Sequence, residues 1–258
     1  MAFPTSRIGL NFLFLLIAFC SSPPATAKTL TIATASNFHS TLLKLVESFH
    51  KLNPSVRINI SSGSSGSLYT RISMGAPYDL FFSADVDTPK RLDGQGLVKK
   101  NTRFTYAYGR LAFWAPGDNA KISVREMIEK HQGKLVIANP KIAPYGKAAE
   151  QLLKLYSKDS KKYQLVVAEN VVQAHQYIKG GSVVAGFVSY SQLLLRGGQA
   201  RGYIAVFDDK QLEQQVVLLS RSREVELALE FLRFIQSDGA RKIIEDSGYR
   251  LPKAGGDV

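Results

Sequence analysis

The apolar residues of the first hundred positions follow two periods that alternate along the chain. A period of two, or an unbroken apolar run, predicts a strand, and apolar residues three and four apart predict a helix. Strands are therefore expected at 29–33, 56–60 and 78–84, and helices at 41–52, 68–74 and 88–97. Asn53-Pro54 ends the first helix, because a proline disfavours helical backbone in the residue before it.

The same alternation returns after a long extended run at 104–114, which has Gly109 in its middle. Further strands are expected at 135–138, 164–168, 183–188, 203–207 and 216–219, and helices at 124–131, 147–156, 171–178, 191–196 and 224–235, with a last helix ending at Asp246. Two such sets predict an α/β protein with two doubly wound lobes, whose ligand sites lie at the carboxyl ends of the strands.

The chain begins with the features of a secretory signal peptide. Residues 1–27 contain one charge, Arg7, and an apolar run from Phe12 to Phe19 that is too short to span a bilayer. Ala25-Thr26-Ala27 then supplies the small residues that a signal peptidase needs, so we expect cleavage after Ala27. The alternative of a lipid anchor at Cys20 is disfavoured, because the preceding Phe19 is bulky.

Composition narrows the possible functions. Cys20 is the one cysteine, so the mature chain would have neither a disulfide nor a thiolate metal site. The formal net charge is +12, but the Lys and Arg residues are dispersed, and secretion argues against nucleic acid as a partner. We therefore interpret the charge as a solvated surface that attracts small anions.

Four predicted strand-to-helix loops share one chemical character. Each carries small or amide-bearing residues at a helix start, and together they comprise residues 34–37, 64–67, 143–146 and 169–171. Helix N-termini hold unpaired N–H groups and a positive partial charge, so several of them converging would solvate a buried anion without any Lys or Arg. In the simpler alternative, Ser36, Asn37, Ser65 and Asn170 are ordinary helix caps. The recurrence in four equivalent places favours an anion site.

Known catalytic patterns do not occur in the sequence. The four histidines lack the H-E-x-x-H spacing of a zinc site. The cluster Ser61–Ser67 lacks the G-x-S-x-G of a hydrolase as well as the Walker and dinucleotide fingerprints. We expect no catalytic residue, no cofactor and no directly coordinated metal cation. A secreted hydrolase that uses a serine of this cluster is kept as an alternative.

Several segments resemble the periplasmic molybdate-binding proteins of ABC transporters, which belong to the two-lobed solute-binding proteins. The segment Gly75–Asp85 (GAPYDLFFSAD) is similar almost residue for residue to that family's GAPaDLFiSAD pattern. Ala33–Asn37, Gly186–Val188 and Ser247–Tyr249 extend the resemblance over essentially the whole mature chain.

Carried over by position, the resemblance implies a set of oxyanion ligands. They are Ser36, Asn37, Ser65, Tyr145 and Val171, the last two acting chiefly through backbone N–H groups. Some relatives add a tyrosine hydroxyl at the strand end after Gly186. Here Ser189 stands at that place with Tyr190 one residue later, so this additional contact is open between them.

The resemblance also implies a type II periplasmic-binding-protein fold with the ligand in a cleft. Residues 28–109 and 209–258 would form lobe I and residues 110–208 lobe II, with hinges near Gly109 and Asp208-Asp209. The implied function is capture of molybdate, and of tungstate, by a monomeric, non-enzymatic periplasmic protein that delivers it to an inner-membrane permease. Sulfate, phosphate or an iron–anion complex stays open as the ligand, because sequence does not give cavity size.

Overall fold

The computed structural model describes residues 28–117, 124–130, 133–156, 163–194 and 202–253. The expected signal peptide, its cleavage site after Ala27, and Cys20 lie outside these residues. None of the described helices combines the length and the apolarity that a membrane span requires.

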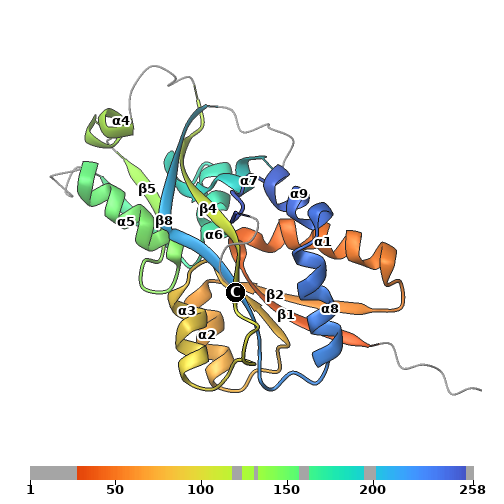
Figure 1. Cartoon of the computed structure of the whole chain (residues 1–258). Helices are drawn as coiled ribbons and strands as arrows, with labels where there is room; N and C mark the ends of the chain where they lie inside the picture. The colour runs from red at the N-terminus through yellow and green to blue at the C-terminus, as the bar shows by residue number, and fades with distance from the viewer. Residues whose placement is uncertain (1–27, 118–123, 131–132, 157–162, 195–201, 254–258) are drawn as a thin grey trace, which may run out of the picture.

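A mixed sheet with strand order β2-β1-β3-β8-β4-β7-β5-β6 runs through the described chain (Figure 1). At one end, β1 (Thr29–Ala35) pairs in parallel with β2 (Arg57–Gly63) and β3 (Leu80–Phe82). The helices of this end are η1 (Ser36–Phe38, a 3₁₀ turn), α1 (His39–Leu52), α2 (Ser65–Ser73), α3 (Asp87–Gly94), α8 (Val225–Ile235) and α9 (Asp238–Asp246). We call these strands and helices the first half.

The other end of the sheet repeats the plan, and we call it the second half. Here β5 (Lys134–Ala138) pairs in parallel with β6 (Gln164–Ala168) and β7 (Ala185–Ser189). Its helices are α4 (Val124–Lys130), α5 (Pro144–Tyr156), α6 (Val171–Lys179) and α7 (Tyr190–Leu194). The alternation of strands and helices confirms the predicted α/β class.

Two long antiparallel strands, β4 (Phe104–Ala115) and β8 (Tyr203–Leu218), join the halves. The prediction of separate strands at 203–207 and 216–219 was wrong, since the chain stays extended between them. Residues 208–215 are mostly polar and give no apolar alternation, yet Asp208 and residues 213–215 pair with β4. The pairing has two irregularities, and at the second one Tyr108 pairs with Glu213, whereas Arg110 pairs with Asp208. Both predicted hinges lie there, and hinge motion stays a prediction.

Helices cover both faces of each half, because successive strand residues point to opposite sides. In β3, Leu80 and Phe82 pack with α1, α8 and α9, while Phe81 packs with α2 and α3. In the second half, α4 and α5 cover one face and α6 and α7 the other. The buried hydrophobic residues form separate clusters in the two halves. Those of the first half come from residues up to Ala107 and from Val216 onward, whereas those of the second half come from residues 111–212 together with Ala35 and Ala84. The predicted lobe boundaries stay a prediction.

Asp79, which lies just before β3, holds two separate segments in place. Its Oδ2 accepts a 2.7 Å hydrogen bond from the Thr31 N–H of β1, and its Oδ1 accepts one of the same length from the Ser222 hydroxyl before α8. The residue is buried, so these bonds replace the water that its carboxylate loses. Asp79 therefore fixes β1 relative to the chain that leaves the sheet after β8.

We expect Asp79→Ala to lower the free energy of unfolding by about 2–4 kcal/mol, because it leaves a buried N–H and a hydroxyl without their acceptor. The measurement is denaturant unfolding at neutral pH. Asp246→Ala is the control, since Asp246 makes an exposed i,i+4 pair with Lys242 and should cost less than about 0.5 kcal/mol. Equal losses in the two variants would contradict this role of Asp79.

Candidate functional site

The four loops singled out in the sequence follow β1, β2, β5 and β6 and open η1, α2, α5 and α6. Two of them touch directly, because the Gly66 N–H donates to the Ile142 carbonyl oxygen at 2.9 Å. A Cβ at position 66 would lie 2.9 Å from that same oxygen, so the approach requires glycine. The other two loops meet at a shared cavity lined by Ser36 and Asn170. The structure thus brings loops of both halves together.

The helix caps leave a specific set of N–H groups unused. The Ser64 hydroxyl accepts from the Ser67 N–H, and the Asn170 Oδ1 accepts from the N–H groups of Val172 and Gln173. The Ser65 and Val171 N–H groups, one at the start of each helix, donate to no residue that the structure describes.

The start of α5 shows the same arrangement. Its first residue, Pro144, has no N–H, and the Gly146 and Lys147 N–H groups donate to the Ala143 carbonyl oxygen. The Tyr145 N–H is left without an acceptor in the described chain. Three helices therefore each present one unpaired N–H, and it belongs to the residue that the sequence had assigned as a ligand.

Two serine hydroxyls add donors to these N–H groups. The Ser65 side chain is fully buried, and its Oγ accepts from the Ala84 N–H at 3.0 Å, which leaves its own proton available to donate. The Ser36 hydroxyl has no hydrogen-bond partner within the described ranges, and Ser36 is buried in the wall of the cavity. Both are neutral and can give a hydrogen bond to an anion.

Asn37 lies at the centre of a buried network that joins the halves. Its Nδ2 lies 3.0 Å from the Gln214 Oε1, 3.2 Å from the Tyr249 hydroxyl and 3.5 Å from the Tyr145 hydroxyl. Its carbonyl oxygen accepts from the Tyr249 hydroxyl at 2.8 Å and from the Ser191 hydroxyl at 3.3 Å. The side chain is thereby fixed at the junction of η1, α5 and β8.

The structure places Ser189 and Tyr190 in different surroundings. Ser189 ends β7, is buried, and its hydroxyl donates to the Tyr145 hydroxyl at 3.3 Å. Tyr190 begins α7, and its ring lies under the Arg110 guanidinium at 4.7 Å. Ser189 therefore belongs to the polar network beside Tyr145, and Tyr190 lies apart from it. The side chains separate because the strand ends between them, which the sequence did not show.

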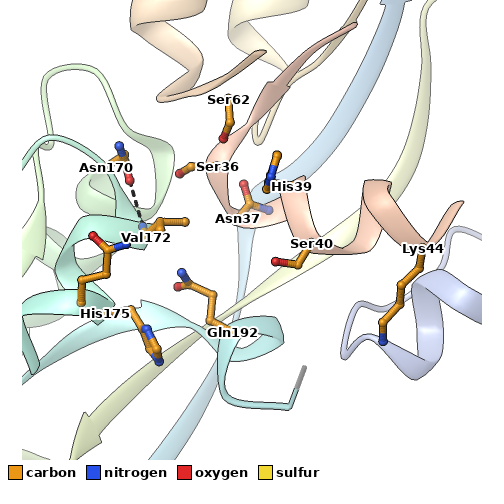
Figure 2. A pocket seen from close by; sticks show the side chains of 11 residues that line it. Ser36, Asn37, His39, Ser40, Lys44, Ser62, Asn170, Val172, His175 and Gln192 are labelled. Atoms are coloured by element: carbon orange, nitrogen blue, oxygen red, sulfur yellow. Dashed lines mark hydrogen bonds between the residues drawn. The ribbon is translucent and has the colours of Figure 1, made fainter. Parts of the chain in front are cut away.

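A cavity of about 370 Å³ adjoins these loops, and Figure 2 shows it between η1 and α1 on one side and α6 on the other. Its walls are formed by Ser36, Asn37, His39, Ser40, Lys44, Ser62, Asn170, Val172, His175, Gln176 and Gln192. This lining contains one lysine and two histidines and no carboxylate. Ser65, Tyr145 and Val171 are buried and do not line it, so the cavity lies outside the set of unpaired N–H groups.

The electrostatics of the site come from dipoles and not from formal charges. Burial raises the pKa of Tyr145 and that of Tyr106 well above the ordinary value, and it raises the pKa of Tyr249 to about 12, so all three hydroxyls stay neutral. Burial also lowers the pKa of His39 at the cavity, which favours its neutral form. The residues that the structure describes contain no cluster of His, Cys, Asp or Glu able to hold a metal ion.

Sequence reasoning missed several members of this region. Gln214 lies in the polar stretch that was not assigned to a strand, and Tyr106 lies in an extended run that offered no sign of its hydroxyl's partner. Tyr249 was noticed as part of Ser247–Tyr249 but was given no role. His39 begins α1 and Lys44 lies in its second turn, where a polar side chain is normally solvated.

Comparison with known proteins relates the chain to one family. A family model described as "Bacterial extracellular solute-binding protein" matches residues 30–250. The molybdate-binding protein ModA of Azotobacter vinelandii is 33% identical over 237 residues, which is 88% of this chain and 92% of that protein. ModA of Rhodobacter capsulatus is 32% identical over 247 residues, which is 95% of this chain and 96% of that protein.

The fold is similar to that of a solved relative. The structure of the Azotobacter vinelandii periplasmic molybdate-binding protein superposes with a TM-score of 0.79 at 34% sequence identity. The superposition covers 87% of this chain and 100% of that chain.

The neutral tyrosines predict a loss of stability at alkaline pH. Tyr249 ionises near pH 10 when unfolded and near 12 when folded, so its contribution is intact below pH 10 and is lost as the pH rises toward 12. Tyr106 and Tyr145 act in the same direction, and each group costs up to about 1.4 kcal/mol per pH unit in this window. Denaturant unfolding at pH 9 and pH 11 measures the loss.

Tyr249→Phe should flatten this pH dependence. The control is Tyr69→Phe, because Tyr69 is only partly buried and the hydrogen bond from Gln95 lowers its pKa, so its removal does not flatten the slope. If the free energy of unfolding of Tyr249→Phe falls between pH 9 and pH 11 as steeply as that of the wild type, the burial of a neutral Tyr249 would be contradicted.

Proposed function

Because the chain belongs to the bacterial extracellular solute-binding proteins, we propose that it captures molybdate, and also tungstate, and delivers the anion to an ABC transporter in the membrane. In this proposal it is a monomeric, non-enzymatic protein of the periplasm, exported by the signal peptide of residues 1–27. The similarity to ModA proteins over nearly their full length supports the ligand and the transporter.

The observation that carries the proposal is the set of unpaired N–H groups at Ser65, Tyr145 and Val171. A buried N–H without a partner is costly, so three of them in loops that the fold brings together imply an acceptor that the protein itself does not provide. A tetrahedral oxyanion offers several oxygens to such donors. The hydroxyls of Ser36 and Ser65 add further donors, with Asn37 beside them.

The chemistry of the donors favours a fully deprotonated dianion. N–H groups, neutral hydroxyls and an amide donate hydrogen bonds, and the buried tyrosines retain their protons. Ser36, Asn37, Ser65, Tyr145 and Val171 include no carboxylate that could accept a proton from a partly protonated anion. Fixed dipoles at helix starts stabilise negative charge without the desolvation of a lysine or arginine.

We also propose that the two halves close on the anion as lobes, residues 28–109 with 209–258 and residues 110–208. The irregular pairing of β4 and β8 at Gly109 supports hinges there, since a break in the ladder lets the backbone bend without losing regular bonds. The Gly66 to Ile142 hydrogen bond links the two parts, which supports an arrangement in which the lobes meet. The basic lining of the cavity at Lys44 suits the approach of an anion.

Calorimetry on the dialysed protein lacking residues 1–27 should show one molybdate per chain bound at micromolar or lower concentrations, and tungstate should compete for the same site. Sulfate at the same concentration should not displace molybdate. No binding of either metal oxyanion would overturn the proposed function, and displacement by equimolar sulfate would indicate a different oxyanion as the ligand.

Ser65→Ala should weaken molybdate binding by about 1–3 kcal/mol, about 5- to 150-fold, because it removes a donor from a desolvated anion and an acceptor from the Ala84 N–H. Ser73→Ala is the control, since Ser73 lies exposed at the end of the same helix and bonds with Gln95. Unchanged affinity in Ser65→Ala would remove Ser65 from the proposed ligands.

A further inference from the structure

Gln214 lies outside both the proposed ligands and the cavity wall, yet it contacts two of the ligands. It is fully buried on β8, next to an irregularity in the pairing with β4. A buried primary amide needs partners for an oxygen and two N–H groups, so its complete burial requires a reason.

The amide of Gln214 connects three tyrosine and asparagine side chains. Its Oε1 accepts from the Asn37 Nδ2 at 3.0 Å and from the Tyr106 hydroxyl at 2.8 Å. Its Nε2 donates to the Tyr145 hydroxyl at 3.2 Å. Reversing the amide would set its NH2 group against the Asn37 Nδ2, which can only donate, so that bond would be lost, whereas the two tyrosine hydroxyls can donate or accept. The orientation of the amide is therefore fixed.

The backbone beside Gln214 is shaped to allow these contacts. Gly109 of β4 is buried, and a Cβ at this position would overlap both the Gln214 Nε2 and the Tyr145 hydroxyl. The absence of a side chain at 109 thus provides the space in which Gln214 and Tyr145 meet. The position that the sequence suggested as a hinge also has this steric requirement.

Gln214 joins parts of the molecule that are distant in sequence. Asn37 lies in η1 of the first half, Tyr145 lies in α5 of the second half, and β8 pairs with β3 of the first half and with β4. One amide therefore fixes the side chains of two proposed ligands relative to each other and to the strand that links the halves.

We infer that Gln214 is a positioning residue of the anion site, which, through the Asn37 side chain and the Tyr145 hydroxyl, holds η1 and the start of α5 in the arrangement that presents their donors to a tetrahedral oxyanion. This inference rests on the proposed function. Gln214 itself does not contact the anion, because its oxygen and its nitrogen face Asn37, Tyr106 and Tyr145. Without the hydrogen bonds of Gln214, Asn37 and Tyr145 can reorient in the free protein. Binding must then order them again, and the entropy lost in doing so weakens the affinity for the anion.

The test compares molybdate affinity in Gln214→Met and in Gln215→Met. Methionine preserves the approximate volume of the side chain and removes all three hydrogen bonds. Gln215 is the matched control, because it is the next residue of β8, is also buried, and bonds instead with Arg103 and Thr105. We expect an affinity loss of about tenfold or more in Gln214→Met and less than about twofold in Gln215→Met, with thermal unfolding confirming that both are folded.

A double-mutant cycle separates positioning from general destabilisation. If Gln214 acts through Tyr145, then Gln214→Met combined with Tyr145→Phe should bind molybdate no more than about twofold worse than the weaker single variant. The inference would be overturned, and the proposed function would stand, if the fold-losses of affinity of the two single variants multiply in the double variant. An unchanged affinity in Gln214→Met would overturn it as well. If wild-type protein binds neither molybdate nor tungstate, the proposed function fails and the inference falls with it.

A second variant covers failure of the methionine variant to fold. Gln214→Asn keeps the amide but shortens the side chain by one methylene, so it cannot reach Asn37, Tyr106 and Tyr145 together. Wild-type affinity in a folded Gln214→Asn protein would equally overturn the positioning role. The role would be supported if Gln214→Asn weakens binding by itself but adds little to the loss caused by Tyr145→Phe in the double variant.

Discussion

A buried N–H needs an acceptor, and this requirement explains most of what is particular to the site. Ser64 and Asn170 satisfy the neighbouring N–H groups of their helices and leave those of Ser65 and Val171 unused. At α5, Pro144 removes one N–H from the same region and Tyr145 supplies the next. Ordinary capping chemistry therefore determines which N–H groups stay unpaired, and the residue type at those positions matters little, which is why the proposed ligands include a valine.

The sheet order brings these donors together from distant parts of the sequence. Strands β1 and β2 lie at one end of the sheet and β5 and β6 at the other, and β8 and β4 lie between them. The two central strands carry a buried polar network instead of a fully apolar core at their midpoint, with Tyr106 and Gln214 among its members. Each of these groups has a partner, so the network adds rigidity where an unsatisfied polar group would destabilise the fold.

The sequence predicted the elements well wherever apolar periodicity was strong. The short strands and amphipathic helices of both halves follow directly from it, and the four loops could be picked out because strand, small residues and helix follow in fixed order. The continuity of β8 could not be predicted, since Asp208 to Gln215 is polar and its strand geometry depends on pairing with β4, about a hundred residues earlier. Gln214 and Tyr249 were missed for the same reason: their partners are distant in sequence. Helix caps depend only on their own helix, yet of the cap candidates only Asn170 caps one, and the cap of α2 is Ser64 and not Ser65.

The contact of Gly66 with Ile142 has a kinetic consequence. It joins backbone to backbone, so its strength does not depend on the side chain at position 142, and it lies beside the fully buried Ser65. Under the proposed closure of the lobes, an anion held at the Ser65 N–H leaves only after these two loops separate. The residence time of the ligand then reflects the rate of that separation as well as the strength of the hydrogen bonds to the anion.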